Sequence, residues 1–156
     1  MENTFFYNTR VARIGISDNG HSITKVYYAD DIDSSNTNIN ETPLISKAAK
    51  QIIEYLDGER TTFDLPIETT GTEFQKKVWK ALMEIPYGQT QSYKDIAIKV
   101  GSPLAYRAVG MANNKNPISI IIPCHRVIGA NGKLVGYGGG LDIKVELLNI
   151  EKEKIK

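Results

Sequence analysis

Near the amino terminus, apolar and polar positions alternate in the way expected of antiparallel strands. The alternation runs over residues 11–16 and again over residues 22–28. Asp18-Asn19-Gly20 lies between the two stretches, and Asn-Gly tolerates the positive φ of a tight hairpin turn. The pattern therefore predicts a β-hairpin, and the polar stretch at 34–40 predicts an exposed loop after it.

The spacing of apolar residues then becomes helical. Between Pro43 and Gly58, apolar residues recur every three or four positions, which predicts an amphipathic helix. Residues 61–65 predict a short strand before Pro66. Residues 1–70 are thus predicted to be a small α+β scaffold that carries no evident chemistry.

The second half of the chain predicts three helices in close succession. Thr72 with Gln75, and Ser92 with Asp95, have the spacing of capping boxes that begin two helices. Ser102-Pro103 is predicted to begin a third helix that runs to about Asn114. Short helices joined by a glycine-containing turn indicate a helix-turn-helix, an outline that many helical pairs share without contacting DNA.

The third helix combines small residues with a single charge. Ala105, Ala108 and Ala112 share a stripe, Gly110 lies beside it, and Arg107 is the only charged residue. Small side chains let a helix backbone approach its partner closely. The partner is either a neighbouring helix or a nucleic-acid groove.

Charge is divided unevenly along the 156 residues. The net charge of +1 combines −5 over residues 1–70, with six basic and eleven acidic side chains, and +6 over the rest, with thirteen and seven. The basic half is the one expected to meet a polyanion. No apolar run is long enough for a membrane span, and the amino terminus does not have the pattern of a secretory signal, so we expect a cytoplasmic protein without membrane contacts.

The chain has one cysteine, so no intrachain disulfide can form. Cys124 follows an isoleucine-rich run at 118–122, which predicts a buried strand that Pro123 ends. The thiol is either an inert core residue or a nucleophile. His125 and Arg126 follow directly, and because neither side chain belongs in an apolar core, they favour the nucleophile.

A nucleophilic cysteine needs a base, because the thiolate is the reactive form. His125 could accept the proton through a water if a carboxylate held its other ring nitrogen, and the closing helix at 141–154 offers Glu146 or Glu151. The residues alone do not choose between them. Two histidines and one cysteine do not make a zinc site, so no metal is predicted.

Residues 136–140 place four glycines around Tyr137. Such a segment could fold over a flat ligand, or it could be a plain connector.

The segment Ile122-Pro123-Cys124-His125-Arg126-Val127 resembles the active-site signature of the O6-alkylguanine-DNA alkyltransferases. Five further features stand in register with that family: Ser92-Tyr93, Arg107 to Gly110, Asn116-Pro117, the glycines around Tyr137, and Leu147-Leu148 with Glu151. The resemblance covers residues 71–156 strongly and residues 1–70 in outline only.

The resemblance implies an α+β fold of two domains. Residues 1–70 would form a small antiparallel sheet with a helix, in RNase H-like outline. Residues 71–156 would form a mostly helical, winged helix-turn-helix domain that binds DNA and accepts the alkyl group. The implied partner is double-stranded DNA containing alkylated guanine, with no cofactor, and the protein is expected to be a monomer.

The implied activity is DNA repair by direct reversal. Guanine would be flipped out of the duplex, and Cys124 would take its O6-alkyl group irreversibly, once per molecule, with O4-alkylthymine raised as a second substrate. A non-catalytic lesion-binding or regulatory module is the alternative. A cysteine hydrolase is a third reading, but it would need an oxyanion hole that the sequence does not indicate.

The resemblance also implies a role for each matching residue. His125 would be the water-mediated base, oriented by Glu151 in preference to Glu146; Asn116 would brace the cysteine, and Tyr93 would protonate guanine N3 or steer the leaving base. Arg107 would fill the space of the flipped nucleotide. The remaining predicted DNA contacts are Ala105, Tyr106, Ala108, Gly110, Met111, Ala112, Asn113 and Arg126. The predicted base pocket consists of Tyr137, Gly138, Val127 and Pro117.

Overall fold

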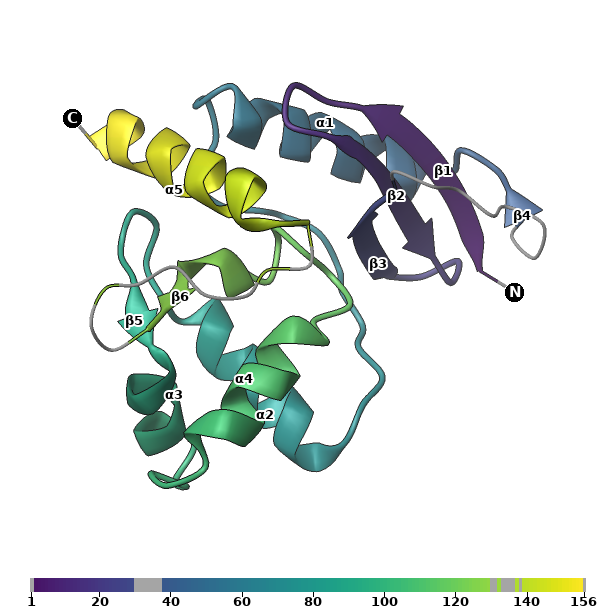
Figure 1. Cartoon of the computed structure of the whole chain (residues 1–156). Coiled ribbons are helices and arrows are strands. Elements are labelled where there is room, and N and C mark those ends of the chain that lie inside the picture. The colour runs from purple at the N-terminus through teal and green to yellow at the C-terminus, as the bar shows by residue number, and fades with distance from the viewer. Residues whose placement is uncertain (1, 30–37, 130–131, 133–136, 138, 156) are drawn as a thin grey trace. The chain divides into compact units, whose positions relative to one another are not determined.

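The computed structural model describes residues 2–29, 38–129, 132, 137 and 139–155, with the backbone alone for 154 and 155 (Figure 1). The chain separates into two units. The first is Met1–Thr69 with Pro117–Ile121, and the second is Thr70–Asn116 with Ile122–Lys156.

The predicted hairpin is present in the first unit, at one side of its sheet. It consists of β2 (Arg13–Asp18) and β3 (Ile23–Tyr28), which pair antiparallel. Strand β1 (Asn3–Asn8) pairs with β2, and the short edge strand β4 (Asn38–Ile39) pairs with β1, which gives the order β3-β2-β1-β4. These two strands were not predicted, and β4 lies in a stretch expected to be loop.

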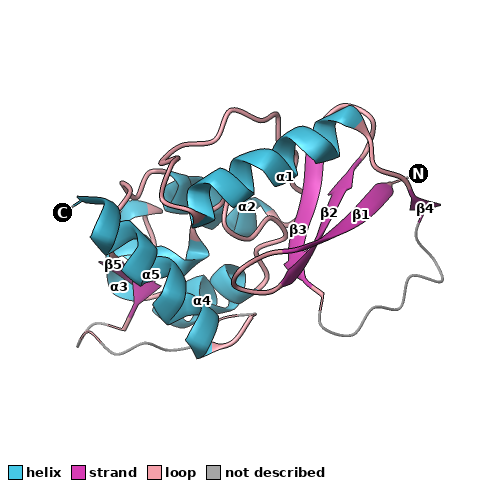
Figure 2. Ribbon diagram, turned by 90° about the horizontal axis from the view of Figure 1, so that it is seen from above, coloured by secondary structure: helices cyan, strands magenta, loops and turns pink. Residues whose placement is uncertain are grey.

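The predicted helix of the first unit is confirmed as α1 (Pro43–Leu56). Thr42 caps it by accepting a hydrogen bond from the Ile45 backbone N–H. The helix packs against the three long strands, as Figure 2 shows. Ile45, Ile52 and Leu56 are buried, as are Ile14 and Ile16 of β2, so the core lies between helix and sheet.

Two predicted strands are wrong. Residues 61–65 form turns and extended chain, and the connection to the sheet is a single bridge between Ile67 and Ile23. In the isoleucine-rich run, Ile118 makes one bridge to Val26. The backbone then turns at Ile120, which has φ 72°. A β-branched residue rarely adopts that conformation, so this turn interrupts the run before Cys124.

The second unit contains the three predicted helices. They are α2 (Glu73–Met83), α3 (Tyr93–Lys99) and α4 (Tyr106–Asn114). Both predicted capping boxes are present. The third helix begins at Tyr106 rather than at Pro103, because residues 102–105 form a turn closed by a hydrogen bond from the Ala105 N–H to the Ser102 carbonyl.

The rest of the second unit packs around these helices. A 3-10 turn, η1 (Cys124–Arg126), leads into β6 (Val127–Ile128), which pairs in parallel with β5 (Gln91–Ser92). Helix α5 (Leu141–Ile155) closes the chain and contacts η1. Trp79 of α2 donates a hydrogen bond to the Ala112 carbonyl at 2.8 Å, which ties α2 to α4. Within the described residues, no helix is long and apolar enough to cross a bilayer.

Candidate active site and DNA-binding surface

Cys124 begins the η1 turn and is 4% exposed. Its backbone N–H donates to the Ile122 carbonyl at 2.8 Å, and its own carbonyl accepts from the Val127 N–H. Burial raises the pKa of the thiol to about 11, and the Asn116 side chain and the Lys144 charge oppose that rise. The sulfur therefore rests as a thiol and needs help to ionise.

Asn116 lies where the resemblance implies a brace for the cysteine. Its amide donates to the Ile122 carbonyl at 2.8 Å and also hydrogen-bonds the Cys124 thiol. Asn116 thus holds both the turn that precedes the cysteine and the sulfur itself.

Glu151 gathers three groups from distant parts of the second unit. One carboxylate oxygen lies 2.7 Å from His125 Nε2, and the other accepts the Gly88 backbone N–H at 2.9 Å. The Arg126 guanidinium adds contacts of 3.0–3.2 Å to both oxygens. The carboxylate on the imidazole is therefore that of Glu151, whereas Glu146 is half-buried one and a half turns earlier on α5.

His125 is fully buried. Burial lowers the pKa of its imidazole; Glu151 raises it, and the charges of Arg126 and Lys144 lower it further. The ring is accordingly neutral near pH 7, the form that can accept a proton.

Arg126 was expected to contact DNA, and that prediction is wrong. Its side chain is 7% exposed, pairs with Glu151, and donates to the Ile85 carbonyl at 2.8 Å. A guanidinium held in this way has a structural role and is not available to a phosphate. The cation also lies 5.5 Å from the centre of the Tyr87 ring.

Tyr93 is brought to the cysteine by the pairing of β5 with β6. That pairing places Ser92 opposite Ile128, and Tyr93 follows Ser92 at the start of α3. Burial raises the pKa of the half-buried phenol, and the nearby Cys124 raises it further, so the phenol keeps its proton. A Cβ at Gly110 would lie 3.8 Å from the ring, so the α4 backbone passes close to Tyr93.

Helix α4 divides the predicted DNA contacts into two groups. Arg107, Tyr106, Ala108 and Met111 are exposed, and Ala105 and Gly110 are half-buried. Ala112 and Asn113 are each 2% exposed, which contradicts their predicted place on the DNA surface. The Asn113 amide instead donates to the Cys124 carbonyl at 3.4 Å, behind the site. Leu104, which the sequence interpretation overlooked, is 89% exposed just before the helix.

The predicted base-pocket residues come from both units, and one of them is not described. Val127 is buried beside Cys124, and Tyr137 is half-buried. Pro117 belongs to the first unit, where its carbonyl accepts the Val26 N–H at 3.0 Å. Gly138 lies outside the described residues.

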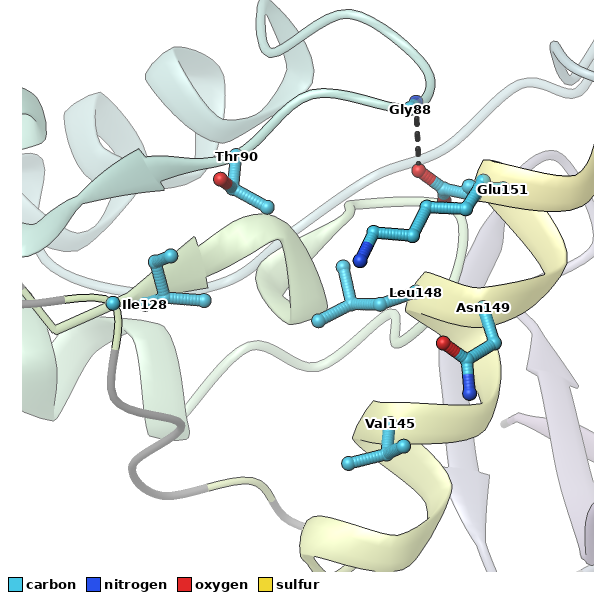
Figure 3. A pocket seen from close by; sticks show the side chains of 9 residues that line it. Gly88, Thr90, Ile128, Val145, Leu148, Asn149 and Glu151 are labelled. Atoms are coloured by element: carbon cyan, nitrogen blue, oxygen red, sulfur yellow. Dashed lines mark hydrogen bonds between the residues drawn. The ribbon is translucent and has the colours of Figure 1, made fainter. Parts of the chain in front are cut away.

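Glu151 also lines a cavity of about 330 Å³ (Figure 3). Ile128 of β6 and Val145 and Leu148 of α5 flank it, and the bond from Gly88 to Glu151 crosses one end. Cys124 does not line this cavity.

Lys144 is a buried charged residue beside the cysteine turn that the sequence interpretation missed. It is 0% exposed, and its ammonium donates to the Val127 carbonyl at 2.6 Å. The available signal was its spacing: Lys144 precedes Glu151 by seven residues, which places both on the same face of a helix.

A helix-turn-helix outline, together with a buried cysteine whose neighbouring histidine is held by Glu151, indicates a DNA-binding protein with a cysteine as its reactive group. The comparisons with known proteins are more specific. The family model for the DNA-binding domain of 6-O-methylguanine DNA methyltransferase matches residues 73–153, and the model for its ribonuclease-like domain matches residues 5–69. The chain belongs to the 6-O-methylguanine DNA methyltransferase family.

Individual relatives agree with the family assignment. A methylated-DNA–protein-cysteine methyltransferase of Methanosarcina barkeri is 56% identical over 76% of this chain and 75% of its own. The constitutive Bacillus subtilis enzyme is 55% identical over 78% and 74%. The crystal structure of Mycobacterium tuberculosis OGT in complex with DNA matches with a TM-score of 0.90 and 42% identity over 97% of this chain and 94% of that one. The predicted fold, a small sheet domain followed by a helical DNA-binding domain, is confirmed.

Proposed function

We propose that this protein repairs DNA by moving an alkyl group from guanine O6 onto the Cys124 sulfur, once per molecule. The observation that carries the proposal is the buried ion cluster at Glu151, which holds a neutral imidazole next to the chain's one cysteine. Family membership supplies the substrate class, because the relatives are named for methylated DNA and a protein cysteine.

The chemistry is an in-line displacement at the alkyl carbon. Glu151 engages His125 at Nε2, so Nδ1 receives the thiol proton through a water. The sulfur forms a bond to the alkyl carbon as the carbon–O6 bond breaks, and the electron pair of that bond passes to the purine. Tyr93 keeps its proton at this pH and donates it to guanine N3, so the base leaves neutral.

The product explains why each molecule reacts once. A thioether on Cys124 has no proton to lose and is a poor leaving group. Neither His125 nor Glu151 offers a route back to the thiol.

Access to the sulfur requires the base to leave the helix. Cys124 is 4% exposed, and a stacked base cannot reach such a group, so the nucleotide is extruded at a cost of a few kcal/mol. Arg107 enters the space that the nucleotide leaves. The residues of α4 and its start that contact the groove are Ala105, Tyr106, Ala108, Gly110 and Met111. Val127, Tyr137 and Gly138 receive the base.

The two parts of the chain have different tasks in this proposal. Residues 1–70 are a scaffold, and residues 71–156 bind DNA and accept the alkyl group. The protein acts as a monomer in the cytoplasm, and O4-alkylthymine is a second substrate to test.

The experiment is a count of transferred groups. A duplex with one O6-methylguanine, labelled in the methyl group, is incubated with excess and with limiting protein, and Cys124→Ser is the control. The proposal predicts that label moves to protein up to one methyl per molecule and then stops. Tight binding without transfer would favour a lesion-binding module, and transfer beyond one equivalent would favour a hydrolase. A duplex with O4-methylthymine tests the second substrate in the same format.

A further inference from the structure

The proposed reaction leaves one buried charge without a role. Lys144 is 0% exposed on α5, whereas Lys152, two turns further on, is exposed. A lysine is almost never fully buried unless a partner offsets the loss of water around its ammonium. The burial of the Lys144 ammonium therefore needs a partner that offsets its loss of water.

The contacts of Lys144 place its ammonium at the cysteine turn. Nζ donates to the Val127 carbonyl at 2.6 Å, and the Val127 N–H donates to the Cys124 carbonyl. Val127 is thus held at one end by the residue that carries the nucleophile and at the other by Lys144. Burial lowers the pKa of the Lys144 ammonium, and the Cys124 sulfur opposes that fall; the ammonium in turn lowers the pKa of the thiol.

The other titratable groups around the Cys124 sulfur are either paired with each other or neutral near pH 7. From α5, Lys144 and Glu151 face the site; from η1, His125 and Arg126; and from α3, the phenol of Tyr93. Arg126 and Glu151 pair with each other, and the imidazole and the phenol are neutral near pH 7. Lys144 is then the cation beside the sulfur. It can pair with the Cys124 thiolate when the thiol loses its proton.

We propose that Lys144 is a positioning residue for alkyl transfer and that its buried ammonium is the counterion of the Cys124 sulfur when that sulfur becomes anionic. His125 still takes the proton. Lys144, unlike His125, does not take part in the proton transfer. Its ammonium stabilises the negative charge on the sulfur until the carbon–sulfur bond forms and neutralises that charge. The proposal extends the repair function but does not depend on DNA, because it concerns the ionisation of the thiol.

The test therefore uses the free protein and a small alkylating agent. Iodoacetamide reacts with the thiolate of the only cysteine, and its rate constant is measured from pH 6 to 8 for wild type and for variants at Lys144. We expect Lys144→Met to be at least about tenfold slower throughout, which corresponds to a thiol pKa about one unit higher. Raising the pH by one unit should restore the wild-type rate.

Further variants separate charge from packing. Lys144→Gln can still donate to the Val127 carbonyl but has no charge, and we expect it to be as slow as Lys144→Met. Lys144→Arg keeps the charge and should stay within about threefold of wild type. Lys152→Met removes the same charge from the exposed side of the same helix and should leave the rate unchanged.

Two results would overturn the proposal. One is a Lys144→Met protein that is folded and reacts at the wild-type rate. The other is a slow variant whose rate does not recover at higher pH, since a distorted site would not be rescued in that way. If the Lys144 variants do not fold, the reciprocal measurement decides: in Cys124→Ser, the pKa of Lys144, followed by NMR of its side chain, should be lower than in wild type. An unchanged value would contradict the proposed pair.

Discussion

Replacing Glu151 by glutamine should destabilise the protein more than any other single-atom change in the second unit. The carboxylate oxygens lie within hydrogen-bonding distance of four nitrogen atoms: the Gly88 backbone nitrogen, two nitrogens of Arg126 and the His125 ring. A carboxylate can accept four hydrogen bonds, whereas a glutamine oxygen accepts two and its amide adds two donors. At least two of these nitrogens would then lack a hydrogen-bond acceptor. Arg126 would be left as a buried, uncompensated charge.

The size of the effect follows from that loss. Removing one partner of a buried ion pair costs about 3–5 kcal/mol. The whole free energy of unfolding of a domain is about 5–15 kcal/mol. Glu151→Gln should therefore lose a large part of the stability, and transfer to Cys124 should slow by at least about a hundredfold because the imidazole is no longer held.

Urea denaturation followed by tryptophan fluorescence measures the first effect. Trp79 is the only tryptophan and is buried in α2, in the same unit as Glu151. Glu146→Gln is the matched control on α5 and should change the free energy of unfolding by no more than about 0.5 kcal/mol. If the two variants unfolded at the same urea concentration, the description of Glu151 as a shared acceptor would be wrong.

Three further predictions concern DNA binding, pH and helix packing. Arg107→Ala should leave stability unchanged but slow methyl transfer from duplex DNA at least about tenfold. It should also lower the salt dependence of DNA binding by about one ion. Lys50→Ala is the control, and equal effects in both variants would refute a special role for Arg107. Because the pKa of Cys124 is raised from 9.0 to about 11, stability should be unaffected below pH 9 and fall by about 3 kcal/mol between pH 9 and 11, as the unfolded chain loses this proton first. Cys124→Ser should lack that part of the fall, so parallel curves for the two proteins would contradict the assignment. Trp79→Phe leaves the Ala112 carbonyl without its donor and should cost about 1–3 kcal/mol in thermal unfolding followed by circular dichroism, whereas no change would show that the bond to α4 is dispensable.

Local signals were sufficient for the elements that depend on local chemistry. The hairpin turn at Asn19-Gly20 and the capping boxes at Thr72 and Ser92 are present as predicted, because each is a contact between residues close in sequence. Strand β1 was missed because Phe5, Phe6 and Tyr7 are consecutive aromatic residues and do not alternate with polar ones.

Errors at the site have a common cause, which is that charge partners come from far along the chain. Arg126 looked like a surface cation because its partner, Glu151, lies 25 residues later. Lys144 was overlooked because nothing near it in sequence indicates the Val127 carbonyl. By contrast, the family resemblance already implied Glu151 in preference to Glu146, and it is the Glu151 carboxylate that lies at the imidazole.

The most direct test of the account is the mass of the peptide that contains Cys124 after incubation with duplex DNA bearing O6-methylguanine. We expect a gain of one methylene on that peptide, on no other peptide, and restoration of guanine in the DNA. Guanine restored while the Cys124 peptide keeps its original mass would show that the alkyl group goes elsewhere and would contradict the central claim.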